Sequence, residues 1–169
     1  MRIGRAVEVA FHDTLAGRFH SERPRCRKLA DTIPFVRRNA RRNQPMNATE
    51  PRKVVAIVGA GDAIGAAVGR RFAKGGYTVC LIRRSLEKAA AHVDAIVAAG
   101  GEAQAFSIDA RDESAVVTLF ETIERDVGSL EVCLFNAGAN TQTGALDTSG
   151  PLFHRVWQLA CFAGFVNCG

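Results

Sequence analysis

The sequence predicts an α/β protein built on a parallel β-sheet. Four short apolar runs begin near residues 54, 77, 103 and 130, and a stretch with helical periodicity follows each of them. Strands and helices that alternate at this pitch are typical of βαβ units, in which a crossover helix joins neighbouring parallel strands. The composition agrees with this class, since 47% hydrophobic and 23% charged residues are usual for a globular domain.

The first βα unit begins at residue 53. Residues 53–58 read KVVAIV, a β-branched run of the kind that forms a strand buried on both faces. After a glycine-rich turn, Ile64, Val68 and Phe72 recur at helical spacing, and Gly75 follows as a stop signal. This unit therefore predicts a central strand and a helix that covers one face of the sheet.

Three further units continue the pattern. Their strands are predicted at residues 77–82, 103–108 and 130–135. Ser85 is a suitable N-cap for the second helix, which Gly100 ends, and Gly128 ends the third helix. We expect a doubly wound sheet that stops after the fourth strand and the helix that follows it.

The turn after the first strand has the composition of a phosphate-binding loop. Residues 59–65 read GAGDAIG, with glycines at positions 59, 61 and 65. Such a turn brings backbone N–H groups and the positive end of a helix dipole to the pyrophosphate of a dinucleotide. An ordinary tight turn is the alternative, whereas a P-loop is excluded because no GK[ST] follows. The turn predicts a Rossmann-type, dinucleotide-binding domain.

Three motifs resemble the short-chain dehydrogenase/reductase family. The turn that begins at Val58 is similar to the family's TGxxxGxG, with Val58 in place of Thr and Ala63 in place of the middle glycine. Asp109, in SIDARD, resembles the family's strand-end Asp beside the adenine, and FNAGAN at residues 135–140 is similar to its NNAG segment. The resemblance covers about residues 52–166, the first half of a family domain. It implies an NAD(P)-dependent oxidoreductase that acts on a small carbonyl or alcohol and forms oligomers.

The end of the second strand bears on the choice of cofactor. An acid there would accept a hydrogen bond from the ribose 2′-hydroxyl of NAD. This chain instead has Arg83 and Arg84, which can pair with the 2′-phosphate of NADP, although Asp62 in the glycine turn opposes a phosphate nearby. We expect NADP rather than NAD; the alternative is that the two arginines form a solvated charged turn.

The resemblance also implies which residues hold the cofactor. Gly59, Gly61, Asp62, Ala63, Ile64 and Gly65 would lie at the pyrophosphate, with Ile64 packed at the helix start; Arg83 and Arg84 at the 2′-phosphate; Asp109 and Ala110 at the adenine; and Asn136, Ala137 and Gly138 at the riboses.

The family's catalytic residues are not matched. Hydride transfer in the family uses a Ser and a YxxxK pair. The single tyrosine of this chain is Tyr77, with Leu81 where the lysine would be required, and the family's relay Asn should fall near Ala160 or Cys161. No catalytic residue is therefore assigned, and the chain is expected to be inactive by itself. The alternatives are a non-catalytic dinucleotide-binding or regulatory module and an inactive truncated gene product.

Other site chemistry finds little support. His92 and His154 are interpreted as surface or packed residues of helices. The five cysteines show no CxxC pair or zinc spacing, which predicts no metal site and a reducing, cytoplasmic compartment. The longest uncharged stretch is shorter than the roughly 20 residues of a membrane span.

The N-terminal segment differs in character from the rest. Residues 1–45 contain 11 basic and four acidic residues, a net charge of +7, without apolar periodicity. We expect a disordered extension at residues 1–45 and a partial NAD(P)-binding domain at residues 46–169. A mitochondrial presequence is opposed by the acids. Nucleic-acid binding is not expected, because the cluster of Arg37, Arg38, Arg41 and Arg42 has no recognisable reading module around it.

Overall fold

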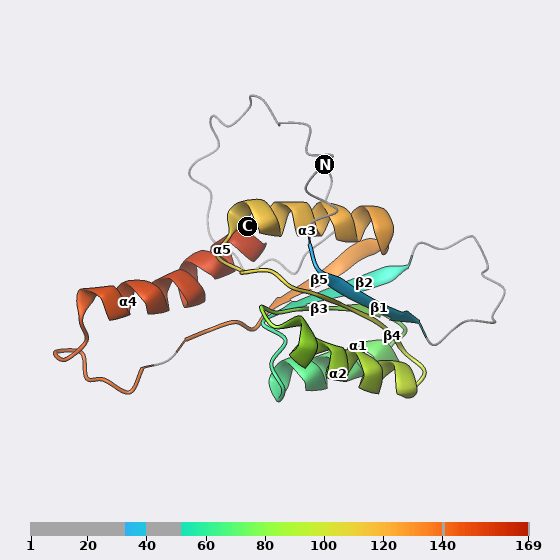
Figure 1. Ribbon diagram of the computed structural model, residues 1–169, viewed down its shortest axis with the longest axis horizontal. Helices are drawn as coiled ribbons and strands as arrows, with labels where there is room; N and C mark the ends of the chain where they lie inside the picture. Colours follow the sequence, from blue (N-terminus) through green and yellow to red (C-terminus); the bar gives the residue numbers. More distant parts are fainter. Residues whose placement is uncertain (1–32, 40–51, 140, 169) are drawn as a thin grey trace, which may run out of the picture.

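A computed structural model describes residues 33–39, 52–139 and 141–168 as one sheet with helices on both faces (Figure 1). The strand order is β1-β4-β3-β2-β5, in which β2 to β5 run parallel and β1 pairs with β4 antiparallel. The strands are β1 Phe35–Asn39, β2 Lys53–Val58, β3 Thr78–Ile82, β4 Glu102–Phe106 and β5 Ser129–Phe135. The helices are α1 Ile64–Lys74, α2 Leu86–Ala98, α3 Glu113–Asp126, α4 Gly150–Trp157, the π-helical segment η2 Gln158–Phe162 and α5 Ala163–Cys168. The predicted α/β class and the parallel sheet of the four predicted strands are confirmed.

Strand β2 lies in the middle of the sheet and is buried on both sides. Val54, Ala56 and Val58 belong to the core beneath α3 and α5, whereas Val55 and Ile57 belong to the core on the other face, with α1 and α2. All five side chains are at most 1% exposed. Since full burial of an aliphatic side chain is worth about 1.5 to 3 kcal/mol, this strand anchors both layers.

The helix starts agree with the sequence at α2. The Ser85 hydroxyl accepts a hydrogen bond from the backbone N–H of Lys88, as expected of an N-cap, and Asp112 caps α3 in the same way through Ala115. The third parallel strand, β4, ends at Phe106, two residues earlier than expected. The backbone N–H of Ser107 still donates to the carbonyl of Pro34 beside β1, and Asp109 lies beyond the end of the strand.

Strand β1 lies in the segment that the sequence analysis assigns to a disordered extension. Its pairing runs from Phe35 opposite Phe106 to Asn39 opposite Glu102, and Ile33 packs against the core on the α3 side. An edge strand held by backbone hydrogen bonds leaves no strong apolar period, so the expectation of no regular structure is wrong for this stretch. The rest of the predicted extension, with Arg41 and Arg42, lies outside the described residues, and its boundary stays a prediction.

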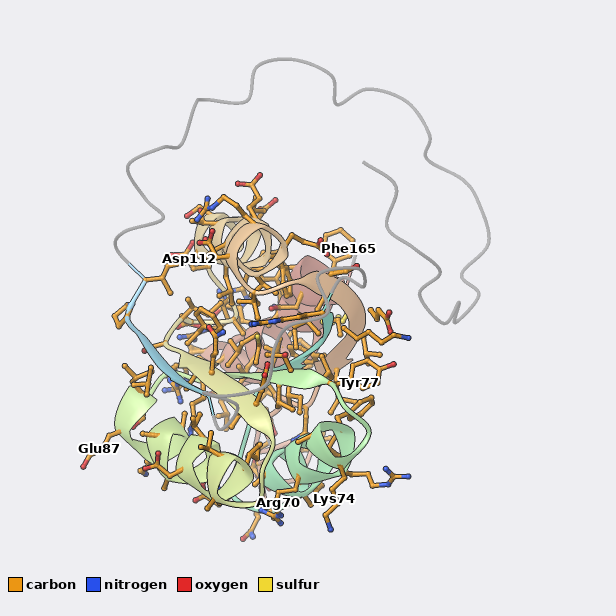
Figure 2. The ribbon with its side chains drawn as sticks, turned by 90° about the vertical axis from the view of Figure 1, so that its right-hand side faces the viewer. Arg70, Lys74, Tyr77, Glu87, Asp112 and Phe165 are labelled. Carbon is orange, nitrogen blue, oxygen red and sulfur yellow. The ribbon has the colours of Figure 1, made fainter. Side chains whose placement is uncertain are left out.

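The opposite edge of the sheet is open in the described part of the chain. Strand β5 pairs with β2 alone, and its side chains are mostly half-buried. Three large apolar side chains beyond it, Phe153, Trp157 and Phe165, are 64%, 42% and 73% exposed. Figure 2 shows Phe165 on the outer surface of this region. No helix among the described residues is long and apolar enough to cross a membrane.

Removal of β1 is expected to destabilise the domain. A chain that begins at residue 46 loses the antiparallel pairing to β4 and the packing of Ile33, so its free energy of unfolding should fall by roughly 1 to 3 kcal/mol. A chain that begins at residue 33 keeps β1 and serves as the control. Urea denaturation monitored by circular dichroism measures both; identical midpoints for the two chains would show that β1 contributes nothing.

Candidate dinucleotide-binding site

The candidate site lies at the carboxyl ends of the parallel strands, at the point where the strand order reverses. From β2 the chain crosses through α1 to β3 on one side, and the later strand β5 lies on the other side of β2. The loops that follow β2 and β5 therefore lead toward opposite faces, and in open α/β sheets ligands bind outside the carboxyl ends of the strands at such a point. The glycine turn at residues 59–65 and the Asn-Ala-Gly turn at residues 136–138 flank this point.

The three glycines of the turn have different roles. Gly59 has φ +79°, and a Cβ on it would lie 2.5 Å from the backbone nitrogen of Ala137. A Cβ on Gly65 would lie 2.7 Å from the Cα of Ala60. At Gly61, in contrast, the nearest atom to a Cβ would be 3.9 Å away. A side chain at Gly59 or Gly65 would thus clash with neighbouring backbone, so both positions require glycine. Gly61 instead borders open space, which a pyrophosphate would need.

Helix α1 begins at this turn without a side-chain cap. Ala63 occupies the N-cap position, and the first turn of the helix contains no acidic residue. The positive end of the helix dipole is therefore available to an anion. Ile64 is 63% exposed rather than packed as expected, whereas Gly65 and Ala66 of the same helical turn are buried. The residues present fit the pyrophosphate of a dinucleotide.

The Asn-Ala-Gly turn is joined to the glycine turn by hydrogen bonds. The backbone N–H of Asn136 donates to the carbonyl of Val58 at 2.8 Å, and its Nδ2 donates to the carbonyl of Gly59 at 3.3 Å. A Cβ on Gly138 would meet no atom within 4 Å. Two segments that are 77 residues apart in sequence are thus brought together as one loop surface.

Arg83 and Arg84, which the sequence analysis treats alike, lie in different surroundings. Nη1 of Arg83 lies 2.9 Å from Oδ1 of Asp62, and Nε2 of His92 lies 3.0 Å from the same oxygen. The bonds from His92 and then Arg83 lower the pKa of Asp62 to about 2. Arg84 is exposed, and its carbonyl accepts a hydrogen bond from Ser107. His92 was missed because no sequence pattern links it to a residue 30 positions away.

Asp109 and Ala110 are already engaged within the protein. The Asp109 carboxylate accepts hydrogen bonds from the backbone N–H, Nε and Nη2 of Arg111, and these bonds lower its pKa to about 2. The carbonyl of Ala110 accepts a 2.9 Å bond from Nδ2 of Asn167, which is buried in α5. The sequence analysis missed Arg111 and Asn167; a lone Asn within the apolar run FAGFVNC was the available signal for the latter.

Tyr77 lies at the wrong end of the sheet to act on a bound nicotinamide. It precedes β3, and its hydroxyl donates to Oε2 of Glu131 at 3.0 Å, which raises the pKa of the tyrosine. Figure 2 shows Tyr77 on the opposite side from Glu87, which stands in the first turn of α2 beside the carboxyl edge. Ala160 and Cys161 are exposed in η2. Among the described residues, no three His, Cys, Asp or Glu side chains gather as metal ligands would.

A glycine turn, an uncapped helix and an adjoining Asn-Ala-Gly turn at a strand-order reversal define a nucleotide-binding α/β domain. The family model described as short chain dehydrogenase matches residues 53–168, and the chain belongs to this family.

Individual relatives cover the same part of the chain. A 3beta-hydroxysteroid dehydrogenase of Mediterraneibacter gnavus is 40% identical over 116 residues, which are 69% of this chain and 41% of that protein. A meso-2,3-butanediol dehydrogenase of Serratia marcescens is 35% identical over 62% of this chain and 41% of its own length. A short-chain dehydrogenase structure from Rhodopseudomonas palustris is 45% identical, with a TM-score of 0.62, over 68% of this chain and 54% of that one. The chain thus spans about two fifths of the length of these curated relatives.

Alanine at Gly59 and Gly61 should separate packing from binding. Gly59→Ala forces a left-handed alanine against the backbone of Ala137, so the free energy of unfolding should fall by more than about 2 kcal/mol. Gly61→Ala, the matched control, should change the free energy of unfolding by less than about 1 kcal/mol and instead weaken the binding of an NAD(P) dinucleotide, because its methyl group enters the space next to the turn. Urea denaturation and calorimetry measure the two effects. Equal destabilisation by both variants would contradict this division of roles.

Proposed function

We propose that this chain forms the cofactor-binding part of an NAD(P)-dependent oxidoreductase that transfers hydride between NADP(H) and a small carbonyl or alcohol. The contact between Gly59 and Ala137 carries the proposal, because it joins the glycine turn to the Asn-Ala-Gly turn at the topological switch point. The nicotinamide, when bound, supplies or accepts the hydride. Relatives named as dehydrogenases of hydroxyl-bearing compounds support the substrate class.

The proposed roles of the residues follow their positions. The backbone of the glycine turn and the start of α1 would hold the pyrophosphate, and the turn formed by Asn136, Ala137 and Gly138 would contact the riboses. Asp109 and Ala110 would border the adenine through a loop that Arg111 and Asn167 hold in place. The free thiols of the four described cysteines support a reducing cytoplasm as the compartment.

NADP(H) is the preferred cofactor in this proposal, and Arg83 is the main reason. Its side chain is 18% exposed and faces the glycine turn, whereas Arg84 is exposed and accepts a hydrogen bond from Ser107 through its backbone carbonyl. A packed guanidinium loses little freedom when it pairs with a phosphate, so it should contribute more than a solvated one.

Arginine substitutions test the cofactor preference. Arg83→Ala should weaken NADP(H) binding by roughly 1.5 to 3 kcal/mol and leave NAD(H) nearly unchanged, as expected for lost hydrogen bonds to a charged group. Arg84→Ala is the matched control and should have less than about half of this effect. Calorimetry with both cofactors gives the four affinities. Equal NADP(H) and NAD(H) affinities in the unsubstituted chain would refute the preference.

A non-catalytic dinucleotide-binding module is the second candidate. The observation that favours it is the position of the single tyrosine, which is bonded to Glu131 at the amino edge of the sheet. Carbonyl reduction needs a proton donor at the developing alkoxide, and general acid catalysis of this kind contributes about 10² to 10⁴-fold. Without YxxxK in its 169 residues, the chain offers no donor of the family type.

The chain by itself is therefore expected not to catalyse hydride transfer. NADPH consumption by protein of verified mass, tested with ketones, aldehydes and quinones, should not exceed that of a cofactor-only blank. Proton delivery and substrate positioning are both lacking, so the deficit should be larger than about 10⁴-fold. Turnover above the blank that Gly61→Ala abolishes would mean that another side chain serves as the acid.

A further inference from the structure

Asp62, Arg83 and His92 form a three-residue cluster (the Asp62 cluster) beside the glycine turn. The residues come from the turn itself, from the end of β3 and from the second turn of α2. Arg83 Nη1 and His92 Nε2 approach a single oxygen, Oδ1 of Asp62, at 2.9 and 3.0 Å. Two donors from separate elements therefore converge on one carboxylate oxygen.

The charge state of Asp62 decides which partner donates. The hydrogen bonds from His92 and Arg83 lower the pKa of Asp62 to about 2, so the group is ionised at neutral pH. An ionised carboxylate can only accept, and the hydrogen in the contact with His92 must therefore lie on Nε2. Arg83 and His92 together make an anion-binding arrangement that the protein's own carboxylate occupies.

Burial differs between the donors and the acceptor. The side chains of Arg83 and His92 are 18% and 19% exposed, whereas that of Asp62 is 72% exposed. The donors are thus held by packing, and the carboxylate can turn into water without uncovering any core. Because exposed ion pairs contribute little net stability, a better anion can replace Asp62 at small cost.

The position of the cluster indicates which anion could replace the Asp62 carboxylate at Arg83 and His92. In dinucleotide-binding α/β folds the adenosine ribose lies at the end of the second strand, which is β3 in this chain. An acid there accepts a hydrogen bond from the 2′-hydroxyl of NAD, and an arginine there accommodates the 2′-phosphate of NADP. The Asp62 cluster offers the acid and the two hydrogen-bond donors, Arg83 and His92, at the same place, but a single ligand cannot use both at once.

We propose that Asp62 and His92 determine how strongly this site distinguishes the two cofactors, an inference that rests on the proposed binding of a dinucleotide. With NAD(H), Asp62 stays in place and accepts a hydrogen bond from the 2′-hydroxyl. With NADP(H), the 2′-phosphate displaces Asp62 and takes the donors of Arg83 and His92. Asp62 thus weakens the NADP preference that Arg83 creates, and His92 is a second phosphate-binding side chain.

Calorimetric titration of the full chain with NADP⁺ and NAD⁺ tests the inference. Asp62→Asn should tighten NADP⁺ binding about tenfold by removing a like charge and weaken NAD⁺ binding about tenfold by removing an ionised acceptor. His92→Ala should weaken NADP⁺ binding about tenfold and leave NAD⁺ unchanged. Glu87→Gln is the matched charge control, since Glu87 is exposed in the first turn of α2 and points away from the sheet (Figure 2). It should change the affinity ratio by less than about twofold.

The possible outcomes distinguish a failure of this inference from a failure of the proposed dinucleotide binding. If the unsubstituted chain binds neither cofactor, the proposed function and the inference both fail. If it binds them but Asp62→Asn changes both affinities equally, or Glu87→Gln has the same effect, this inference alone fails. A second measurement needs no variant of Asp62. The imidazole NMR signals of His92 in the unsubstituted chain should shift with adenosine 2′,5′-bisphosphate and not with adenosine 5′-monophosphate, and unchanged signals with both would overturn the role of His92.

Discussion

The candidate site depends on a steric constraint at Gly59. Its backbone lies against that of Ala137 so closely that no Cβ can be placed between them, and the amide of Asn136 bonds to the Gly59 carbonyl. Parallel pairing of β2 with β5 brings both loops to the same edge of the sheet. The contact therefore turns two loops that lead to opposite faces into one continuous surface. The start of α1 and the open side of Gly61 both border that surface.

Acidic side chains near this surface are neutralised by neighbours within the protein. Asp62 is paired with Arg83 and His92, and Asp109 is paired with Arg111, so both carboxylates have a pKa near 2. An unpaired carboxylate would repel the phosphates of a dinucleotide. The two pairs differ in reach, however. Arg111 is only two residues from Asp109 in the sequence, so this pair links residues within one loop. The Asp62 cluster instead joins three separate elements.

The two edges of the parallel sheet differ in whether a further strand covers them. Strand β1 covers β4 with an antiparallel partner drawn from far upstream, while β5 has one neighbour in the described residues. Beyond β5, the helices α4 and α5 return to the sheet through η2, and Asn167 bonds to the carbonyl of Ala110. Aromatic side chains that include Trp157 and Phe165 remain exposed there.

The sequence by itself determined the four parallel strands, the helices between them and the phosphate-binding turn, because apolar periodicity, caps and glycine spacing are local signals. Ser85 and Gly59 could be assigned in this way. Only the tertiary structure decided the rest. It placed β1 on the sheet, because an edge strand is held by backbone bonds that leave no pattern in the side chains. It also separated Arg83 from Arg84 and brought His92 to Asp62. These contacts join residues 21 and 30 positions apart, and such distances are fixed by the packing of helices on the sheet rather than by any spacing along the chain.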